Sequence, residues 1–158
     1  MSTIEKSIEV NVPLKTAYNQ WTQFEEFPKF MEGVKEVRQL DDKRLRWRAE
    51  IAGKEKEWEA EITEQAPDRR IAWRSRTGAP NGGVVTFHQI SPTTTKIMLQ
   101  LEYDPETFVE KTGDAVGIVS MRVTGDLDRF KTFIESRGQE TGAWRGEIGK
   151  GGDVRKTG

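Results

Sequence analysis

Residues 43–76 read KRLRWRAEIAGKEKEWEAEITEQAPDRRIAWRSR, and this stretch decides the fold. Apolar and charged residues alternate along it almost without interruption. A period of two is typical of β-strands that have one buried face and one face in contact with water. The stretch therefore predicts three antiparallel strands with a functional site on their apolar face. That face carries three of the five tryptophans, Trp47, Trp58 and Trp73.

A tight turn determines how the first two of these strands pair. A two-residue loop at 52–53 would place Trp47 opposite Trp58 on the apolar face. The same register would bring an arginine opposite a glutamate at three positions of the charged face. The expected pairs are Arg48 with Glu57, Arg46 with Glu59 and Arg44 with Glu61.

A second turn, at residues 65–68, predicts the place of the third strand by setting Ile62 opposite Ile71. The charged face would then carry a row of glutamates between two rows of arginines. Exposed ion pairs contribute about 0–1 kcal/mol each, so we expect this ladder to specify register and solubility rather than to bind nucleic acid. The further pairs predicted are Glu59 with Arg74 and Glu57 with Arg76.

The composition indicates one domain and excludes several classes of function. The chain has 158 residues, of which 34% are hydrophobic, enough for a single core. Its 25 basic and 26 acidic residues are interspersed, so no basic surface for nucleic acid is expected. The absence of cysteine excludes disulfides and thiolate chemistry and fits a cytoplasmic location. Neither a signal peptide nor an apolar run of about 20 residues occurs, so we expect no integral membrane association.

The regions on either side of the alternating block predict further strands and two short helices. Alternation over residues 4–12 indicates a first strand, and helical spacing from Leu14 to Trp21 indicates a first helix. A second short helix should run through Phe24, Phe27 and Phe30, where it is interrupted by a proline. The remaining strands are expected near 34–40, 85–89 and 97–103, with a plain loop at 77–83.

A long amphipathic helix is predicted near the C-terminus. Asp104-Pro105-Glu106 is a helix-start signal, and apolar residues then recur at spacings of three and four from Val109 to Ile134. The helix should end near Gly138, and Gly113 would favour a bend. We expect one domain over residues 1–138, followed by a flexible polar tail over 139–158, in which Trp144 is the candidate for docking on the domain.

This arrangement resembles the START-like, helix-grip proteins of the SRPBCC superfamily, in the cyclase/dehydrase subfamily of polyketide cyclase/dehydrase and lipid-transport proteins. The resemblance covers residues 1 to about 137 and implies an α+β fold. In it a curved, seven-stranded antiparallel sheet wraps around the long C-terminal helix, and two short helices lie between strands 1 and 2. The motifs that carry it span residues 18–31, 57–62, 70–75 and 125–134.

The resemblance further implies an apolar cavity between the sheet and the long helix, where relatives bind lipids, quinones, hormones or polyketides. The alternative is that the aromatic side chains fill this space, since each tryptophan buries on the order of 150–250 Å². The ligand-binding residues that it implies here are Phe27, Phe30, Met31, Trp47, Trp58, Trp73, Phe87, Leu99, Tyr103, Val116, Val119 and Ser120.

Catalytic and metal-binding patterns are not evident in the sequence. The single histidine, His88, follows an inward Phe87 and should therefore face solvent, which disfavours a Ser-His-Asp triad. We predict no metal, no cofactor and no catalytic residue, because the acidic residues alternate outward and no glycine-rich phosphate loop precedes a helix. The inward polar candidates are Tyr103, Ser75, Gln89 and Ser120. No arginine is expected to face inward, unless the predicted register is wrong, in which case Arg74 or Arg48 would do so.

Three functions remain open. The first is binding or carrying a hydrophobic small molecule, which we favour over an enzymatic activity. The second is a polyketide aromatase/cyclase, which would require an arginine or a general base in the cavity. The third is a protein-interaction or stress-related START-like module, which an exposed apolar patch would favour.

Overall fold

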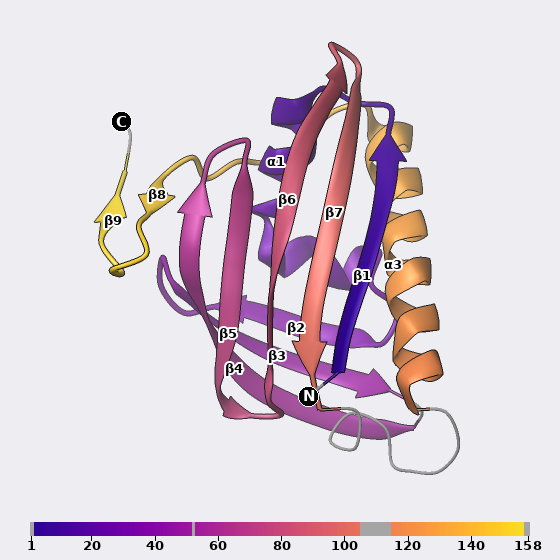
Figure 1. Cartoon of the computed structure of the whole chain (residues 1–158), viewed down its shortest axis with the longest axis vertical. Helices are drawn as coiled ribbons and strands as arrows, with labels where there is room; N and C mark the ends of the chain where they lie inside the picture. The colour runs from indigo at the N-terminus through magenta and orange to yellow at the C-terminus, as the bar shows by residue number, and fades with distance from the viewer. Residues whose placement is uncertain (1, 52, 105–114, 157–158) are drawn as a thin grey trace.

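The computed structural model describes residues 2–51, 53–104 and 115–156. It contains a long antiparallel sheet, two short helical segments that follow the first strand, and one long helix (Figure 1). The elements are β1 Ser2–Val10, α1 Leu14–Trp21, the 3₁₀ helix η1 Phe24–Lys29, β2 Val34–Gln39, β3 Arg44–Ile51, β4 Lys54–Ala66, β5 Arg70–Gly78, β6 Asn81–Ser91, β7 Thr94–Tyr103, α3 Ala115–Arg137, β8 Glu147–Ile148 and β9 Val154–Arg155.

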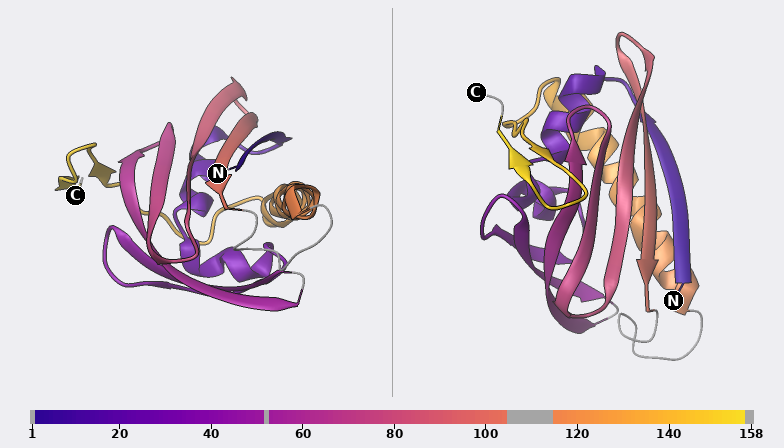
Figure 2. Two further views of the ribbon diagram at one scale, coloured as in Figure 1. Left: turned by 60° about the horizontal axis from the view of Figure 1, so that its bottom comes forward. Right: turned by 60° about the vertical axis from the view of Figure 1, so that its left-hand side comes forward.

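The seven long strands lie in the order β1-β7-β6-β5-β4-β3-β2. Figure 2 shows the sheet curving around α1, η1 and α3, with α3 beside β1. This is the predicted α+β helix-grip architecture, which is therefore confirmed. The strand count is higher than expected because two short strands, β8 and β9, extend the sheet.

The register predicted for β3 and β4 is confirmed. Trp47 lies opposite Trp58, and the three arginines of β3 lie opposite the expected glutamates. Inward residues such as Leu45 and Ala49 are buried, whereas Arg46 between them is exposed. The apolar alternation is sufficient here because a shift by one residue would place charged side chains in the core.

The register predicted for β4 and β5 is wrong. Ile62 pairs with Trp73 rather than with Ile71, and Arg74 lies opposite Glu61 rather than Glu59. The turn lies at residues 67–69, between Ala66 and its partner Arg70, and not at 65–68, so the pairing already differs from the prediction next to the turn. Register irregularities between residues 59 and 60 and between 62 and 64 change the pairing further along the two strands.

The predicted loop at residues 77–83 is also wrong, because β5 continues to Gly78 and β6 begins at Asn81. Gly78 has a φ of +80°, and a Cβ at this position would lie 2.2 Å from the carbonyl oxygen of Glu57. Glycine is therefore needed for a close approach of two strands. The glycine- and proline-containing composition of this segment is typical of a loop, so the sequence does not reveal that β5 ends and β6 begins within it.

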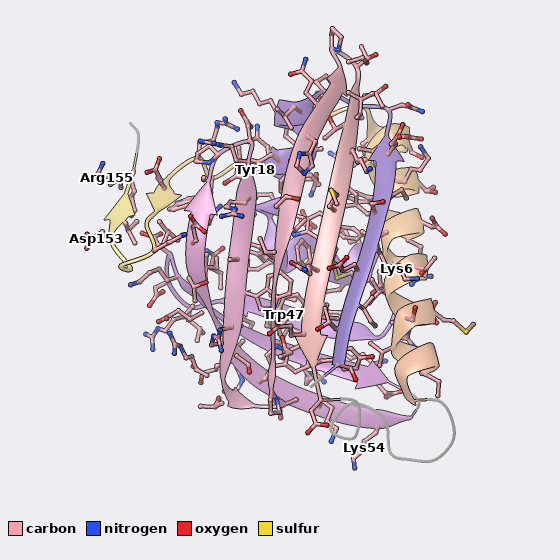
Figure 3. All side chains as sticks on the ribbon, in the orientation of Figure 1. Lys6, Tyr18, Trp47, Lys54, Asp153 and Arg155 are labelled. Carbon is pink, nitrogen blue, oxygen red and sulfur yellow. The ribbon has the colours of Figure 1, made fainter. Side chains whose placement is uncertain are left out.

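The outer face of the sheet carries an ion-pair ladder. Figure 3 shows nitrogen- and oxygen-tipped side chains projecting from the strands. Arg46 contacts Glu57 at 3.3 Å and Arg48 contacts Glu55 at 3.5 Å, while Arg76 of β5 pairs with Glu61. The glutamates of β4 thus lie between arginines of both neighbouring strands. The partly exposed positions limit each pair to about 0–1 kcal/mol.

The long helix α3 packs one apolar face against the sheet. Its buried side chains include Val119, Val123, Leu127 and Phe130. It ends where predicted, at Gly138, whose φ is +74° and whose backbone N–H donates to the carbonyl of residue 134 over 2.9 Å. The helix start predicted at 104–106 and the bend predicted near Gly113 involve residues 105–114, which lie outside the described part of the chain.

Residues 139–156 pack on the domain, where the sequence predicts a flexible tail. Ile148 is only 1% exposed and pairs with Gln65 at the edge of β4. Arg145 forms a two-pronged ion pair with Asp68, with N···O distances of 2.7 and 3.0 Å. These anchors are isolated residues in a glycine-rich segment, which gives no periodic signal. The domain boundary at residue 138 stays a prediction.

No helix within the described ranges has both the length and the apolar character needed to cross a lipid bilayer.

Candidate functional site

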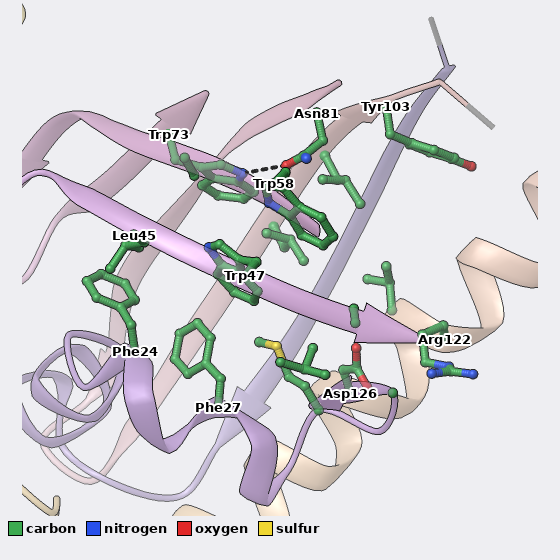
Figure 4. Close-up of a pocket in the computed structure, with 18 of the residues that line it drawn as sticks. Phe24, Phe27, Leu45, Trp47, Trp58, Trp73, Asn81, Tyr103, Arg122 and Asp126 are labelled. Atoms are coloured by element: carbon green, nitrogen blue, oxygen red, sulfur yellow. Dashed lines mark hydrogen bonds between the residues drawn. The ribbon is translucent and has the colours of Figure 1, made fainter. Parts of the chain in front are cut away.

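A cavity of about 180 Å³ lies between the concave face of the sheet and α3, and η1 closes one side of it (Figure 4). Its walls come from α1, η1, the strands β2 to β7 and α3. Strand residues reach it at alternate positions, because only one face of the sheet points inward. Eight of the twelve predicted ligand-binding residues line it: Phe27, Met31, Trp47, Trp58, Trp73, Leu99, Tyr103 and Val119.

Two of the other predicted residues lie in the packed core instead. Phe87 contacts Tyr18 with ring centroids 5.3 Å apart, and Phe30 contacts Phe130 at 5.1 Å. Both rings face inward as expected, but they lie next to α1 and α3, which fill the space in front of them. Sequence periodicity predicts which face of a strand a residue lies on. It does not predict where along the strand the cavity begins.

The last two predicted residues belong to α3. Ser120 is partly exposed and does not line the cavity. The side chain of Val116 lies outside the described part of the structure. The helical residues that do reach the cavity lie further along α3: Val119, Arg122, Val123, Asp126 and Leu127.

Trp47 and Trp58 form one wall of the cavity as a stacked pair. Their ring centroids are 5.7 Å apart and their planes differ by 8°. Phe27 packs against Trp47 at 5.7 Å. The two indoles therefore occupy part of the inner space and also border what is left of it.

The polar groups along the sheet side of the cavity bond to one another. The indole N–H of Trp73 donates to the Asn81 side-chain oxygen over 3.2 Å, and the Asn81 amide donates to the carbonyl of Ala79 over 2.9 Å. The backbone N–H of Asn81 donates to the Ser75 hydroxyl oxygen over 3.0 Å. Ser75, predicted as an inward polar candidate, thus supports the β5–β6 turn.

On the helix side, three residues of α3 hold the loop that follows η1. We call Arg122, Asp126 and Arg129 the helix clamp. Arg122 donates to the Glu32 carbonyl over 2.5 Å, and Arg129 donates to the Phe30 carbonyl over 2.9 Å. Asp126 accepts from the backbone N–H of Glu32 over 3.1 Å and from Arg129 over 2.5 Å. The clamp fixes the loop that carries Met31 into the cavity wall.

The helix clamp is not predicted by the sequence patterns. The expectation that no arginine faces the cavity is wrong, since Arg122 is one of its lining residues. The usable signal is the spacing of Arg122, Asp126 and Arg129, four and three residues apart, which places them on one helix face beside the apolar stripe. Charged residues of an amphipathic helix normally face solvent, so the sequence did not predict that these three would contact the loop instead.

Asp126 has an unusual environment for a carboxyl group. Burial raises its pKa to about 6, although the hydrogen bond from Arg129 and the charge of Arg122 act in the opposite direction. Desolvation exceeds charge stabilisation here because the carboxyl lies between the helix and the apolar cavity wall. The group is poised to gain or lose a proton near neutral pH.

The remaining chemical candidates face away from the cavity. His88 is exposed, as predicted, and its Nε2 lies 3.0 Å from the Thr86 hydroxyl. Gln89 is also exposed, contrary to its place among the inward candidates. Within residues 2–51, 53–104 and 115–156, no three histidine, aspartate or glutamate side chains gather into a potential metal site.

Comparisons with known proteins agree with this architecture. A solved protein from Deinococcus radiodurans is 30% identical, with a TM-score of 0.67 over 86% of this chain and 99% of its own. The Zhui aromatase/cyclase from Streptomyces sp. R1128 has a TM-score of 0.72 over 90% of this chain and 98% of its own. Its 16% identity shows a shared fold alone.

Sequence similarity gives the family. An uncharacterized 17.2 kDa protein of Streptomyces lincolnensis, from the melC2-rnhH intergenic region, is 54% identical and covers 94% of this chain and 99% of its own. The family model described as "Polyketide cyclase / dehydrase and lipid transport" matches residues 10–132. The chain belongs to the polyketide cyclase/dehydrase and lipid transport family.

Proposed function

We propose that this protein binds a hydrophobic small molecule in the cavity between the sheet and α3. The observation that carries the proposal is an apolar space of about 180 Å³ inside a well-packed fold. Natural cores rarely leave voids larger than a water molecule, so a space of this size suggests a ligand. An engineered cavity of roughly 150 Å³ takes up benzene, which suggests one or two rings or a short alkyl chain as the ligand here.

The expected affinity follows from the apolar surface that such a ligand would bury. A ten-carbon hydrocarbon would gain roughly 8 kcal/mol from burial, at about 0.8 kcal/mol per methylene. Association costs about 4 kcal/mol or more in lost freedom. The difference of at most about 4 kcal/mol predicts a dissociation constant of about 1 mM or weaker, which an NMR titration can measure.

Titration with tetralin, a ten-carbon bicyclic hydrocarbon, tests the proposal. We expect saturable shifts of the indole N–H signals of Trp47, Trp58 and Trp73 in ¹H–¹⁵N spectra. Ala60→Leu should weaken binding at least about tenfold, because Ala60 lines the cavity and a larger side chain would fill it. Ala72→Leu, a matched change on β5 outside the lining, should leave binding unchanged. The absence of saturable shifts would refute the proposal.

A second candidate function is a polyketide cyclase/dehydrase reaction, and Asp126 is the observation that favours it. A cavity-lining carboxyl with a pKa of about 6 is suited to general acid–base catalysis. Such a reaction also needs donors that polarise ketone oxygens inside the cavity. The test is product formation from a poly-β-ketone chain by the wild-type protein and its loss in Asp126→Asn.

A further inference from the structure

Four polar side chains that border the cavity share one property, which is that they bond to other groups of the protein. Trp73 and Asn81 donate and accept within the chain of bonds that ends at Ala79. Arg122 and Asp126 bond to the loop at residues 30–33. The surface that the described lining residues present to the cavity is consequently almost entirely apolar.

Trp47 does not alter this apolar surface, although its indole N–H has no hydrogen-bond partner among the described residues. The nitrogen is covered by protein atoms and has almost no accessible surface. Figure 4 places it on the side of the ring that faces Leu45 and Phe24. A ligand in the cavity would touch the faces and carbon edges of the indole rather than this donor.

Tyr103 is the next polar residue to consider, because it carries the only hydroxyl group among the described lining residues. Its side chain is buried, and Figure 4 shows the hydroxyl directed away from Trp58 and Trp47. The phenyl ring is thus the part of Tyr103 closest to the tryptophans.

From these observations we infer that the cavity selects a hydrocarbon ligand, an alkyl chain or ring system without oxygen substituents in its buried part. The inference rests on the proposed function and adds the chemical class of the ligand to it. A carbonyl oxygen that enters the cavity loses its hydrogen bonds to water and meets a lining surface that is almost entirely apolar. The apolar surface of a hydrocarbon is buried without that loss.

The inference also separates the two candidate functions. A poly-β-ketone chain carries a carbonyl group at every second carbon, and each of them would need a donor inside the cavity. Hydrocarbon selection therefore favours a carrier or sensor of an apolar molecule over a cyclase.

A matched pair of probes tests the inference. Tetralin and 1-tetralone have the same bicyclic skeleton and differ by one carbonyl in place of a methylene group. We expect tetralone to bind wild-type protein more than about tenfold more weakly than tetralin, both measured by the NMR titration above. Tyr103→Phe removes the only hydroxyl group among the described lining residues and measures whether any binding of tetralone depends on it.

The outcomes separate this inference from the proposal on which it depends. If tetralone binds as tightly as tetralin, the cavity offers a donor, and the inference is wrong although ligand binding stands. If Tyr103→Phe weakens tetralone alone, Tyr103 is that donor and the inference is equally wrong. If neither probe binds, the proposed function fails and the inference fails with it. Backbone amide spectra report whether the Tyr103→Phe variant is folded. The ratio of tetralin to tetralone affinity in wild-type protein tests the inference without any variant.

Discussion

Gly33 shows how a single residue can be fixed by its neighbours. Its φ is +91°, and a Cβ there would lie 2.0 Å from Nη1 of Arg122 and 2.6 Å from the carbonyl oxygen of Glu50. Gly53 has a similar φ of +81°, but a Cβ at that position would meet no atom within 4 Å. A side chain at either position would strain the backbone, but only at Gly33 would it also collide with neighbouring atoms.

We predict that Gly33→Ala lowers the free energy of unfolding by more than Gly53→Ala does. A non-glycine residue in this backbone region costs about 1–2 kcal/mol at either position. Gly33→Ala should cost roughly 1–3 kcal/mol more, because Arg122 must move and lose its bond to the loop. Urea unfolding of both variants measures the difference. Equal losses would contradict the described packing around Gly33.

Asp126 should titrate near pH 6 in the folded protein, which ¹³C NMR of its carboxyl carbon can measure. Its folded pKa of about 6 lies above the ordinary value of 3.8, because burial disfavours the charged form. The native state therefore holds the proton more strongly, and the contribution of Asp126 to stability falls as the pH rises from about 4 to about 6.

Asp126→Asn isolates this effect from the other carboxyl groups. The stability of the variant relative to wild type should rise over the same pH interval, since asparagine does not ionise. The shift corresponds to at most about 3 kcal/mol. A carboxyl midpoint near pH 4, or a constant difference between the two proteins, would contradict the buried environment of Asp126.

At the scale of elements, the helix clamp couples α3 to the loop after η1. Arg129 bonds to the carbonyl of Phe30, pairs with Asp126 and lies 3.3 Å from Glu32. We predict that Arg129→Gln lowers the free energy of unfolding by roughly 1–3 kcal/mol, because it leaves Asp126 without its main charged partner. The pKa of Asp126 should rise further, which the NMR titration would detect.

Arg137→Gln provides the control for that prediction. Arg137 also lies on α3, but it is exposed and makes a cation–π contact with Phe133 at 5.8 Å. An exposed contact of this kind contributes about 0.5–1 kcal/mol. If both variants lose equal stability and neither moves the Asp126 titration, the clamp does not hold the loop.

The C-terminal segment is the second element that depends on a few contacts. Arg145 pairs with Asp68, donates to Asn19 over 2.7 Å and lies 5.6 Å above the Tyr18 ring. We predict that Arg145→Gln lowers stability by about 1–2 kcal/mol and increases hydrogen exchange over residues 139–156. Arg155→Gln, at an exposed site of the same segment, should change neither. Unchanged exchange in Arg145→Gln would mean that other residues hold the segment.

The sequence predicted elements well where one physical rule dominates. Alternation and the turn at 52–53 placed Trp47 opposite Trp58, because the turn sets the pairing and a shift by one residue would bury charge. It failed at β5, since the place of the turn at residues 67–69 and the register irregularities between β4 and β5 follow from backbone geometry that leaves no trace in hydrophobicity. It also missed Arg122 and Asp126, because a charged residue on a helix normally faces water, and only the position of the loop explains their orientation.

For the whole molecule, the inner face of the sheet could be predicted but the volume that it encloses could not. Phe30 and Phe87 both face inward, yet α1 and α3 cover them and leave the cavity further along the sheet. The size of a cavity depends on how far each helix lies from the sheet, which is a property of the complete packing. Family membership gives this architecture, and the cavity lining suggests the chemistry of the ligand.

The helix clamp has a consequence for how this protein can evolve. Arg122 and Arg129 hold the backbone carbonyls of Glu32 and Phe30, and the loop side chain that pairs with Arg129 is that of Glu32 and not that of Met31. We therefore expect the loop to keep its place when Met31, which lies between Phe30 and Glu32, is exchanged for a larger or smaller residue. A mutation at this position would then reshape the cavity and leave its wall standing, which is a route by which a chain of this fold could change its ligand.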